Sequence, residues 1–146
     1  MKMKQMLKLT LVLPVITGII IYLSQCGGLI AGFDPIALEN ATSLKKEALD
    51  LMDKANEPYD RHQQEINALE TKLEQAYQYA KEKPKNTHTA SQWEILKDPG
   101  KNLLGGFIKH WQEKSQLSTT FIEEAKKVIA DAFATIIALE SGKSKK

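Results

Sequence analysis

Residues 48–80 read ALDLMDKANEPYDRHQQEINALETKLEQAYQYA, and the spacing of apolar residues in this stretch decides the fold. Apolar or weakly polar residues recur at alternating steps of four and three, while charged residues such as Glu65 and Lys72 stand between them. The recurring positions are Ala48, Met52, Ala55, Tyr59, His62, Ile66, Leu69, Leu73, Ala76 and Ala80. A heptad repeat of this kind predicts an amphipathic helix whose apolar side packs on another helix.

The same helical pattern extends towards the N-terminus, and local sequence signals mark its boundaries. Asp34-Pro35 is a favourable start, because aspartate caps free backbone N–H groups and proline at the first helical position loses no needed hydrogen bond. Pro58 should kink or restart the helix near residues 56–57, since proline lacks a backbone N–H. Pro84 should end it.

Residues 84–102, PKNTHTASQWEILKDPGKN, have a different composition from the helical stretches on either side. They are polar and contain the helix breakers Pro84 and Pro99, so we expect a connector here. Residues 91–94, SQWE, fit a capping box, and a short extra helix is therefore predicted at 92–97.

A second helical region begins near Asn102 and carries an apolar stripe of its own. The stripe breaks near residues 115–120, which predicts a final helix at about 119–140 and a disordered basic tail over 141–146. Gly105-Gly106 in this region predicts either a close backbone approach or a helix that begins only after these glycines. The stripe consists of Leu104, Phe107, Trp111, Phe121, Ala125, Val128, Ala132, Ile136 and Leu139.

The sequence lacks the period-two alternation that marks a β-strand. We therefore predict an all-α domain over residues 34–140. Its expected architecture is a long amphipathic helical hairpin, similar to a coiled coil, with the short extra helix in its connector. Two helices alone bury little surface, and domains near 100 residues are already modest in burial. The apolar stripes should therefore pack on a third helix, on a second copy of the chain, or on another protein.

The first 33 residues differ in character from the rest of the chain. Lys2, Lys4 and Lys8 are their only charged residues, and the stretch from Leu9 to Leu23 carries no charge. A positive start followed by an apolar stretch is the pattern of an export signal, in which the positive end stays in the cytoplasm and the following chain moves outward. We therefore expect the helical domain to lie outside the cytoplasm.

Leu23-Ser24-Gln25-Cys26 follows this apolar stretch directly. It resembles the lipobox of bacterial lipoproteins, in which a leucine stands three residues before the cysteine and a small residue stands two before it. Gln25 differs from the glycine, alanine or serine that usually precedes the cysteine. The resemblance implies that residues 1–25 are a signal peptide and that Cys26 is the lipidated residue.

The same resemblance implies an address for the domain. Residues 26–33 would form a tether, and two or more acyl chains hold a soluble domain stably on a bilayer. Gly27 follows the cysteine where an aspartate could stand, and this is similar to the outer-membrane address of enterobacterial lipoproteins. The implied location is the bacterial cell envelope, on the outer membrane or the periplasmic face of a membrane.

Two other readings of the leader remain open. The apolar zone up to Phe33 is longer than the roughly 20 residues that a membrane span needs, so the chain could keep an uncleaved single-pass anchor. Ordinary cleavage after Cys26 or Ala31 would instead release a secreted protein. All three readings place the helical domain outside the cytoplasm.

Charge and residue chemistry narrow the classes of function. Without the three leader lysines, 17 basic residues face 18 acidic ones, so the net charge falls from +2 to −1 and no general attraction for nucleic acid remains. His62, His88 and His110 do not stand at metal-ligand spacing, and Cys26 is the only cysteine, so we predict no metal and no cofactor. No arrangement of catalytic residues follows from the spacing, and we do not expect an enzyme.

Two functions fit these features. The first is a structural or protein-interaction module whose partner is a helical protein or a second copy of the chain. The alternative is a small inhibitory or ligand-binding lipoprotein that uses the 84–102 connector, with His88, Trp93 and Asp98 at the far end of the hairpin. The residues predicted to contact a partner are Tyr59, Ile66, Leu69, Leu73, Trp93, Phe121, Val128 and Ile136.

Overall fold

The computed structural model describes residues 30–143, and within them it contains five α-helices, one 3-10 turn and no strand. The prediction of an all-α domain is therefore confirmed. The leader, the lipobox-like segment with Cys26, and residues 144–146 lie outside the described residues. The elements are α2 (Pro35–Met52), η1 (Tyr59–Arg61), α3 (Gln63–Glu82), α4 (Thr87–Lys97), α5 (Leu104–Lys114) and α6 (Thr119–Ser141).

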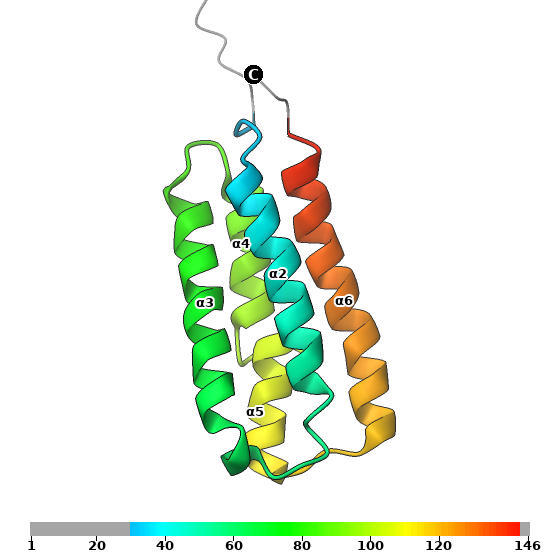
Figure 1. Ribbon diagram of the computed structural model, residues 1–146. Helices are drawn as coiled ribbons and strands as arrows, with labels where there is room; N and C mark the ends of the chain where they lie inside the picture. The colour runs from blue at the N-terminus through cyan, green and yellow to red at the C-terminus, as the bar shows by residue number, and fades with distance from the viewer. Residues whose placement is uncertain (1–29, 144–146) are drawn as a thin grey trace, which may run out of the picture.

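The helices form four antiparallel columns (Figure 1). α2 packs on α3 and α6, and α4 packs on the same two helices, while α5 continues the column that α4 begins. The chain runs down α2, up α3, down α4 and α5, and up α6, which is the up-down-up-down order of a four-helix bundle. The described chain consequently starts and ends at the same end of the bundle (Figure 1).

The structure differs from the predicted hairpin because the heptad stretch does not form one long helix. As expected, Asp34 caps α2 by accepting hydrogen bonds from the backbone N–H groups of Ile36 and Ala37. The chain leaves this helix at Asp53 and reverses direction before α3, around the residue predicted to break the helix, Pro58. The heptad spacing continues through the turn because Ala55 and Tyr59 are also buried there.

The segment predicted to be a connector is the third column of the bundle. α4 begins at Thr87, five residues before the predicted short helix, and packs between α3 and α6. Its buried side chains, which include Thr89 and Ala90 as well as Trp93 and Leu96, follow helical spacing. The sequence analysis did not predict the full length of this helix, because small and polar residues make up part of its buried face. The extra helix that the apolar stripes require is thus supplied by the chain itself.

The final helix turns a different face to the core than its sequence pattern predicts. The predicted stripe runs through Phe121 and Val128, but these two side chains are exposed. The core face lies one position further along, which is a rotation of about 100° around the helix axis. Apolar residues occupy both faces of α6, so the sequence pattern alone allowed two orientations. The buried residues of α6 are Ile122, Ile129, Phe133, Ile136 and Glu140.

Two glycines allow the backbone to pass closely at the junction between α4 and α5. A Cβ atom at Gly105 would lie 2.2 Å from the carbonyl oxygen of Lys97, and one at Gly106 would lie 1.8 Å from that of Lys101. α5 begins at Leu104, so both glycines are helical and the close-approach reading of this pair is correct. No larger residue fits here without moving the junction, which fixes how α5 is offset from α4.

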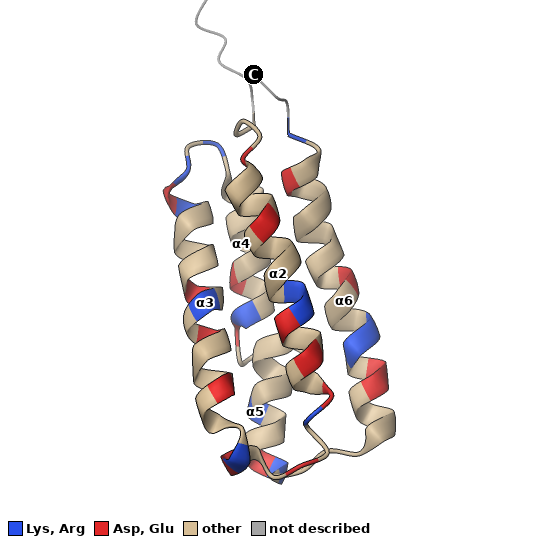
Figure 2. Cartoon of the chain, viewed as in Figure 1, with Lys and Arg blue, Asp and Glu red and all other residues tan. Residues whose placement is uncertain are grey.

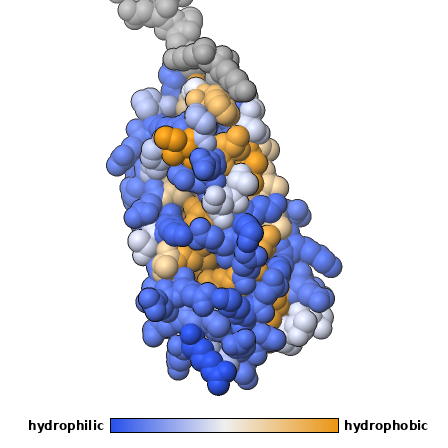
Figure 3. All heavy atoms as spheres, viewed as in Figure 1, coloured by the Kyte–Doolittle hydropathy of each residue, from blue (hydrophilic) through white to orange (hydrophobic). Residues whose placement is uncertain are grey.

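Charged residues of both signs are spread over the outside of the bundle (Figure 2). The face shown in Figure 3 is mostly hydrophilic, with hydrophobic side chains visible in patches within it. None of the helices within residues 30–143 combines the length and the apolar character that a membrane span would require.

Candidate functional site

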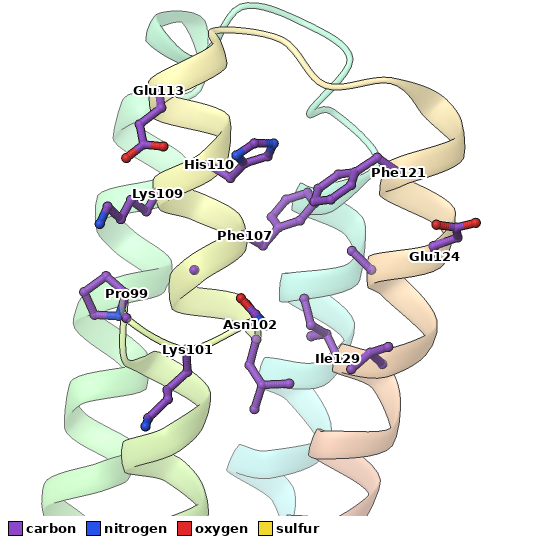
Figure 4. Close-up of a pocket in the computed structure, with 15 residues that line it drawn as sticks. Pro99, Lys101, Asn102, Phe107, Lys109, His110, Glu113, Phe121, Glu124 and Ile129 are labelled. Carbon is purple, nitrogen blue, oxygen red and sulfur yellow. The ribbon is translucent and has the colours of Figure 1, made fainter.

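A groove of about 490 Å³ lies between α5 and the first half of α6 (Figure 4). α6 is one long helix, whereas the third column breaks between Lys97 and Leu104 before it continues as α5. α4 packs firmly on α6, but the principal contacts of α5 are with α4 and η1. The offset of α5 therefore leaves the space beside α6 open.

The floor of the groove is apolar. Phe107 from α5 and Phe121 from α6 stack with ring centroids 6.1 Å apart and an interplanar angle of 9°. Ala125, Val128 and Ile129 continue the floor along α6. Phe121 is 39% exposed and Val128 is 53% exposed, so the groove presents apolar side chains directly to solvent.

Charged side chains flank this floor on both sides (Figure 4). Lys101, Lys109 and Glu113 lie along the α5 side, and Glu124 lies on the α6 side. The ring of His110 tilts against Phe121, with centroids 5.1 Å apart and an interplanar angle of 49°. No group of three or more His, Cys, Asp or Glu side chains within the described residues could hold a metal ion. The groove is thus suited to an apolar surface with charged edges.

Backbone hydrogen bonds at the far end of the bundle fix the start of α6 and hence the position of Phe121. Tyr59 donates its N–H to the carbonyl of Ser115 at 2.8 Å, and Leu117 donates to the carbonyl of Ala55 at 2.8 Å. Ser118 then caps α6 by accepting from the N–H of Phe121 at 3.3 Å. The groove is therefore held by the same contacts that close the turn between α2 and α3.

The eight residues predicted to contact a partner fall into two groups. Only Phe121 and Val128 lie in the groove, where the structure brings them together. The remaining six pack on one another within the chain, and this burial explains their apolar pattern without a partner. These core residues are Tyr59, Ile66, Leu69, Leu73, Trp93 and Ile136.

The three residues singled out in the predicted connector do not form a site. His88 is exposed near the start of α4, whereas Asp98 follows the last residue of that helix. Trp93 is buried and packs edge-on against Phe133, with ring centroids 6.0 Å apart. The carboxylate of Asp98 accepts a hydrogen bond from the N–H of Gly100 at 2.7 Å, which is a turn contact.

A buried polar cluster at the opposite end of the bundle was missed by the sequence analysis. Lys143, placed in the predicted disordered tail, is buried and donates to Asn86 and Glu140. Asn86 in turn donates to the carbonyl of Ala80 at 3.0 Å. The sequence offered one indication of this ion pair, which is the spacing of three residues between Glu140 and Lys143. The prediction of a tail beginning at residue 141 is wrong, because α6 extends to Ser141 and Lys143 packs on the bundle.

A second ion pair reinforces the same end. Asp34, the cap of α2, pairs with Lys83 and also accepts a hydrogen bond from the hydroxyl of Tyr79 at 2.6 Å. Burial lowers the pKa of Lys83, the charge of Glu140 opposes this shift, and Lys143 adds to it. These contacts tie the beginning and the end of the bundle to the α3–α4 turn.

No family model, curated protein or solved structure matches this chain. The leader sequence and the groove are therefore the features from which a function can be inferred.

Proposed function

We propose that this chain is an extracytoplasmic helical lipoprotein, held on a membrane by acylated Cys26, that binds a helical protein partner in the α5–α6 groove. The exposure of Phe121 and Val128 carries the proposal, because the other apolar side chains of the predicted stripes are mostly buried. The role proposed for this groove is therefore binding to the surface of another protein.

The position of the groove supports a tethered arrangement. The described chain begins at the end of the bundle where α6 finishes, and the N–H of Ala31 donates to the carbonyl of Lys85 there at 3.1 Å. Phe121 stands near the other end of α6, which at 1.5 Å per residue is about 30 Å from Ser141. A bundle attached through its N-terminus would thus present the groove well away from the membrane surface.

The shape of the groove favours a helical partner. Its two walls are antiparallel helices, and Phe121, Ala125 and Val128 stand at steps of four and three along α6. Apolar side chains at this spacing receive the apolar face of an amphipathic helix. The flanking charges are placed to contact the polar edges of such a helix.

The mass of the mature N-terminal peptide tests the attachment. We expect wild-type chain from a bacterial membrane fraction to give a peptide that begins at Cys26 and carries added acyl mass. The Cys26→Ala variant should lack this acylated peptide. If its leader is cleaved at another site, the variant should also be absent from the membrane fraction. Circular dichroism of both chains should be the same, because Cys26 precedes the bundle.

Other outcomes contradict the lipid attachment in different ways. A peptide that begins at Met1 would identify a single-pass anchor. A soluble chain that begins after Cys26 or Ala31 would identify a secreted protein. In either case the groove could still bind a partner, but the chain would not be held by a lipid.

A further inference from the structure

α6 is apolar on two faces, and the bundle covers only one of them completely. Ile122, Ile129, Phe133 and Ile136 face the core. A helix with a second apolar face needs a second neighbour. Within the groove α5 covers this second face only in part, because Val128 remains 53% exposed. The second face consists of Phe121, Ala125, Val128, Ala132 and Leu139.

The charges beside this second face differ between the two sides of the groove. At 100° per residue, Glu124 and Asp131 lie on the side of α6 that is turned away from α5, while Lys127 lies further round the helix. Lys101 and Lys109 lie on the α5 side. The α6 side of the groove therefore carries two carboxylates two helical turns apart, with Lys127 between them along the chain, and the α5 side carries two lysines and Glu113.

The charges also correspond in height along the bundle. Figure 4 shows Lys109 and Glu124 at a similar level on opposite sides of the groove, and Lys101 at about the level of Ile129. Asp131 follows Ile129 by two residues, a rise of only about 3 Å. Glu113 is the remaining charge on the α5 side and lies closer than Lys109 to the end of the groove where α6 begins. Residues 119–122 at this start of α6 carry no charge.

We propose that the helical partner of the groove is a second copy of this chain, arranged in parallel about a two-fold axis along the bundle. This arrangement places α6 of each copy opposite α5 of the other at the same height. Glu124 then faces Lys109 of the second copy, and Asp131 faces Lys101. Phe121 and Val128 of both copies become buried between the four helices.

The antiparallel alternative lacks these pairings. It places α6 opposite α6, so that the acidic sides of the two copies face each other. It also puts the two N-termini at opposite ends of the dimer, where they cannot both attach to one membrane. This last reason for the parallel arrangement rests on the proposed function, because it requires attachment to a membrane. Such attachment would also raise the local concentration of both copies.

Zero-length cross-linking of the full chain in its native membranes tests the pairing. Cells are grown to produce a mixture of ¹⁴N- and ¹⁵N-labelled chains, the membranes are treated with a carbodiimide, and cross-linked peptides are identified by mass. We expect mixed-isotope peptides that join Lys109 to Glu124 or Lys101 to Asp131. Peptides from single chains alone, or mixed peptides that join other regions, would overturn the proposal.

Charge reversal supplies the matched control. Glu124→Lys removes the carboxylate of one link, so the dimer is then measured by the Lys101–Asp131 link. The yield of this link should fall about tenfold, because attraction becomes repulsion at both symmetric contacts. The double variant Glu124→Lys/Lys109→Glu should restore the dimer through the reversed pair, observed as a link between residues 124 and 109. An antiparallel dimer would instead be strengthened by Glu124→Lys alone, and that result would overturn the parallel arrangement.

The same experiment separates failure of this inference from failure of the proposed function. A Lys109 peptide linked to a different protein would leave a helical partner for the groove but would exclude a second copy. A monomer that still carries the acylated N-terminus would leave the lipid attachment intact. Loss of both would remove the proposed function together with the dimer.

Discussion

Replacing Trp111 with alanine should lower the free energy of unfolding by about 3–5 kcal/mol, the usual cost of removing a buried aromatic side chain. Trp111 is fully buried, and its ring packs edge-on against Tyr59 with centroids 5.6 Å apart. Its indole N–H also donates to the carbonyl of Glu57 at 3.0 Å. The substitution leaves a cavity and a carbonyl that has lost its donor, at the turn that fixes the start of α6.

Chemical denaturation followed by circular dichroism measures this loss. Ile36→Ala is the control, because the side chain of Ile36 is exposed and lies outside the groove, and its replacement should change the free energy of unfolding by less than about 0.5 kcal/mol. Equal stabilities for the two variants would mean that Trp111 is not part of the core. The packing of Trp111 would then not fix the start of α6 beside the groove.

Lys143→Met should destabilise the bundle by about 3–5 kcal/mol, because it leaves the carboxylate of Glu140 buried without its partner. Glu140 is 1% exposed, and its Oε2 atom has no hydrogen-bond partner even with Lys143 present. The substitution also removes the donor to the side-chain oxygen of Asn86 at 2.6 Å. A disordered tail, as the sequence alone predicts, would give no change in stability.

The double variant Glu140→Leu/Lys143→Met distinguishes a buried ion pair from simple packing. Replacing both charges by apolar groups of similar size often costs little, so most of the stability should return. The coupling between the two substitutions in a double-mutant cycle measures the pair itself. Independent, additive effects would contradict the contact between Lys143 and Glu140.

The helices of the first half of the domain could be predicted from the sequence because their apolar residues lie on a single helix face. Ile66, Leu69 and Leu73 are flanked by charged or polar residues, so a single face can be buried. The chemistry of single residues, independent of this spacing, identified Asp34 as a cap and Pro58 as a break. The reversal of direction at this break could not be predicted, because it depends on hydrogen bonds to Ser115 and Leu117, which are distant in sequence.

The groove could be predicted only in part, because it also depends on how helices that are distant in sequence pack together. Phe121 and Val128 were identified as partner contacts, and this remains a prediction, but they had been assigned to the same stripe as the buried Ile136. α6 is apolar on two faces, and the packing of α2 and α4 on this helix decides which face is covered. The charged flanks of the groove come from two helices, so no spacing within one segment indicates them.

In the proposed arrangement, the bundle lies outside the cytoplasm while its N-terminus is attached to a membrane. A Gln116→Cys variant places a thiol on an exposed residue at the end of the bundle far from the attachment. In cells whose outer membrane has been permeabilised, a membrane-impermeant maleimide should label this residue without lysis, and the labelled chain should sediment with the membranes. Labelling only after lysis, with a cytoplasmic protein as the reference, would place the bundle in the cytoplasm and contradict the account.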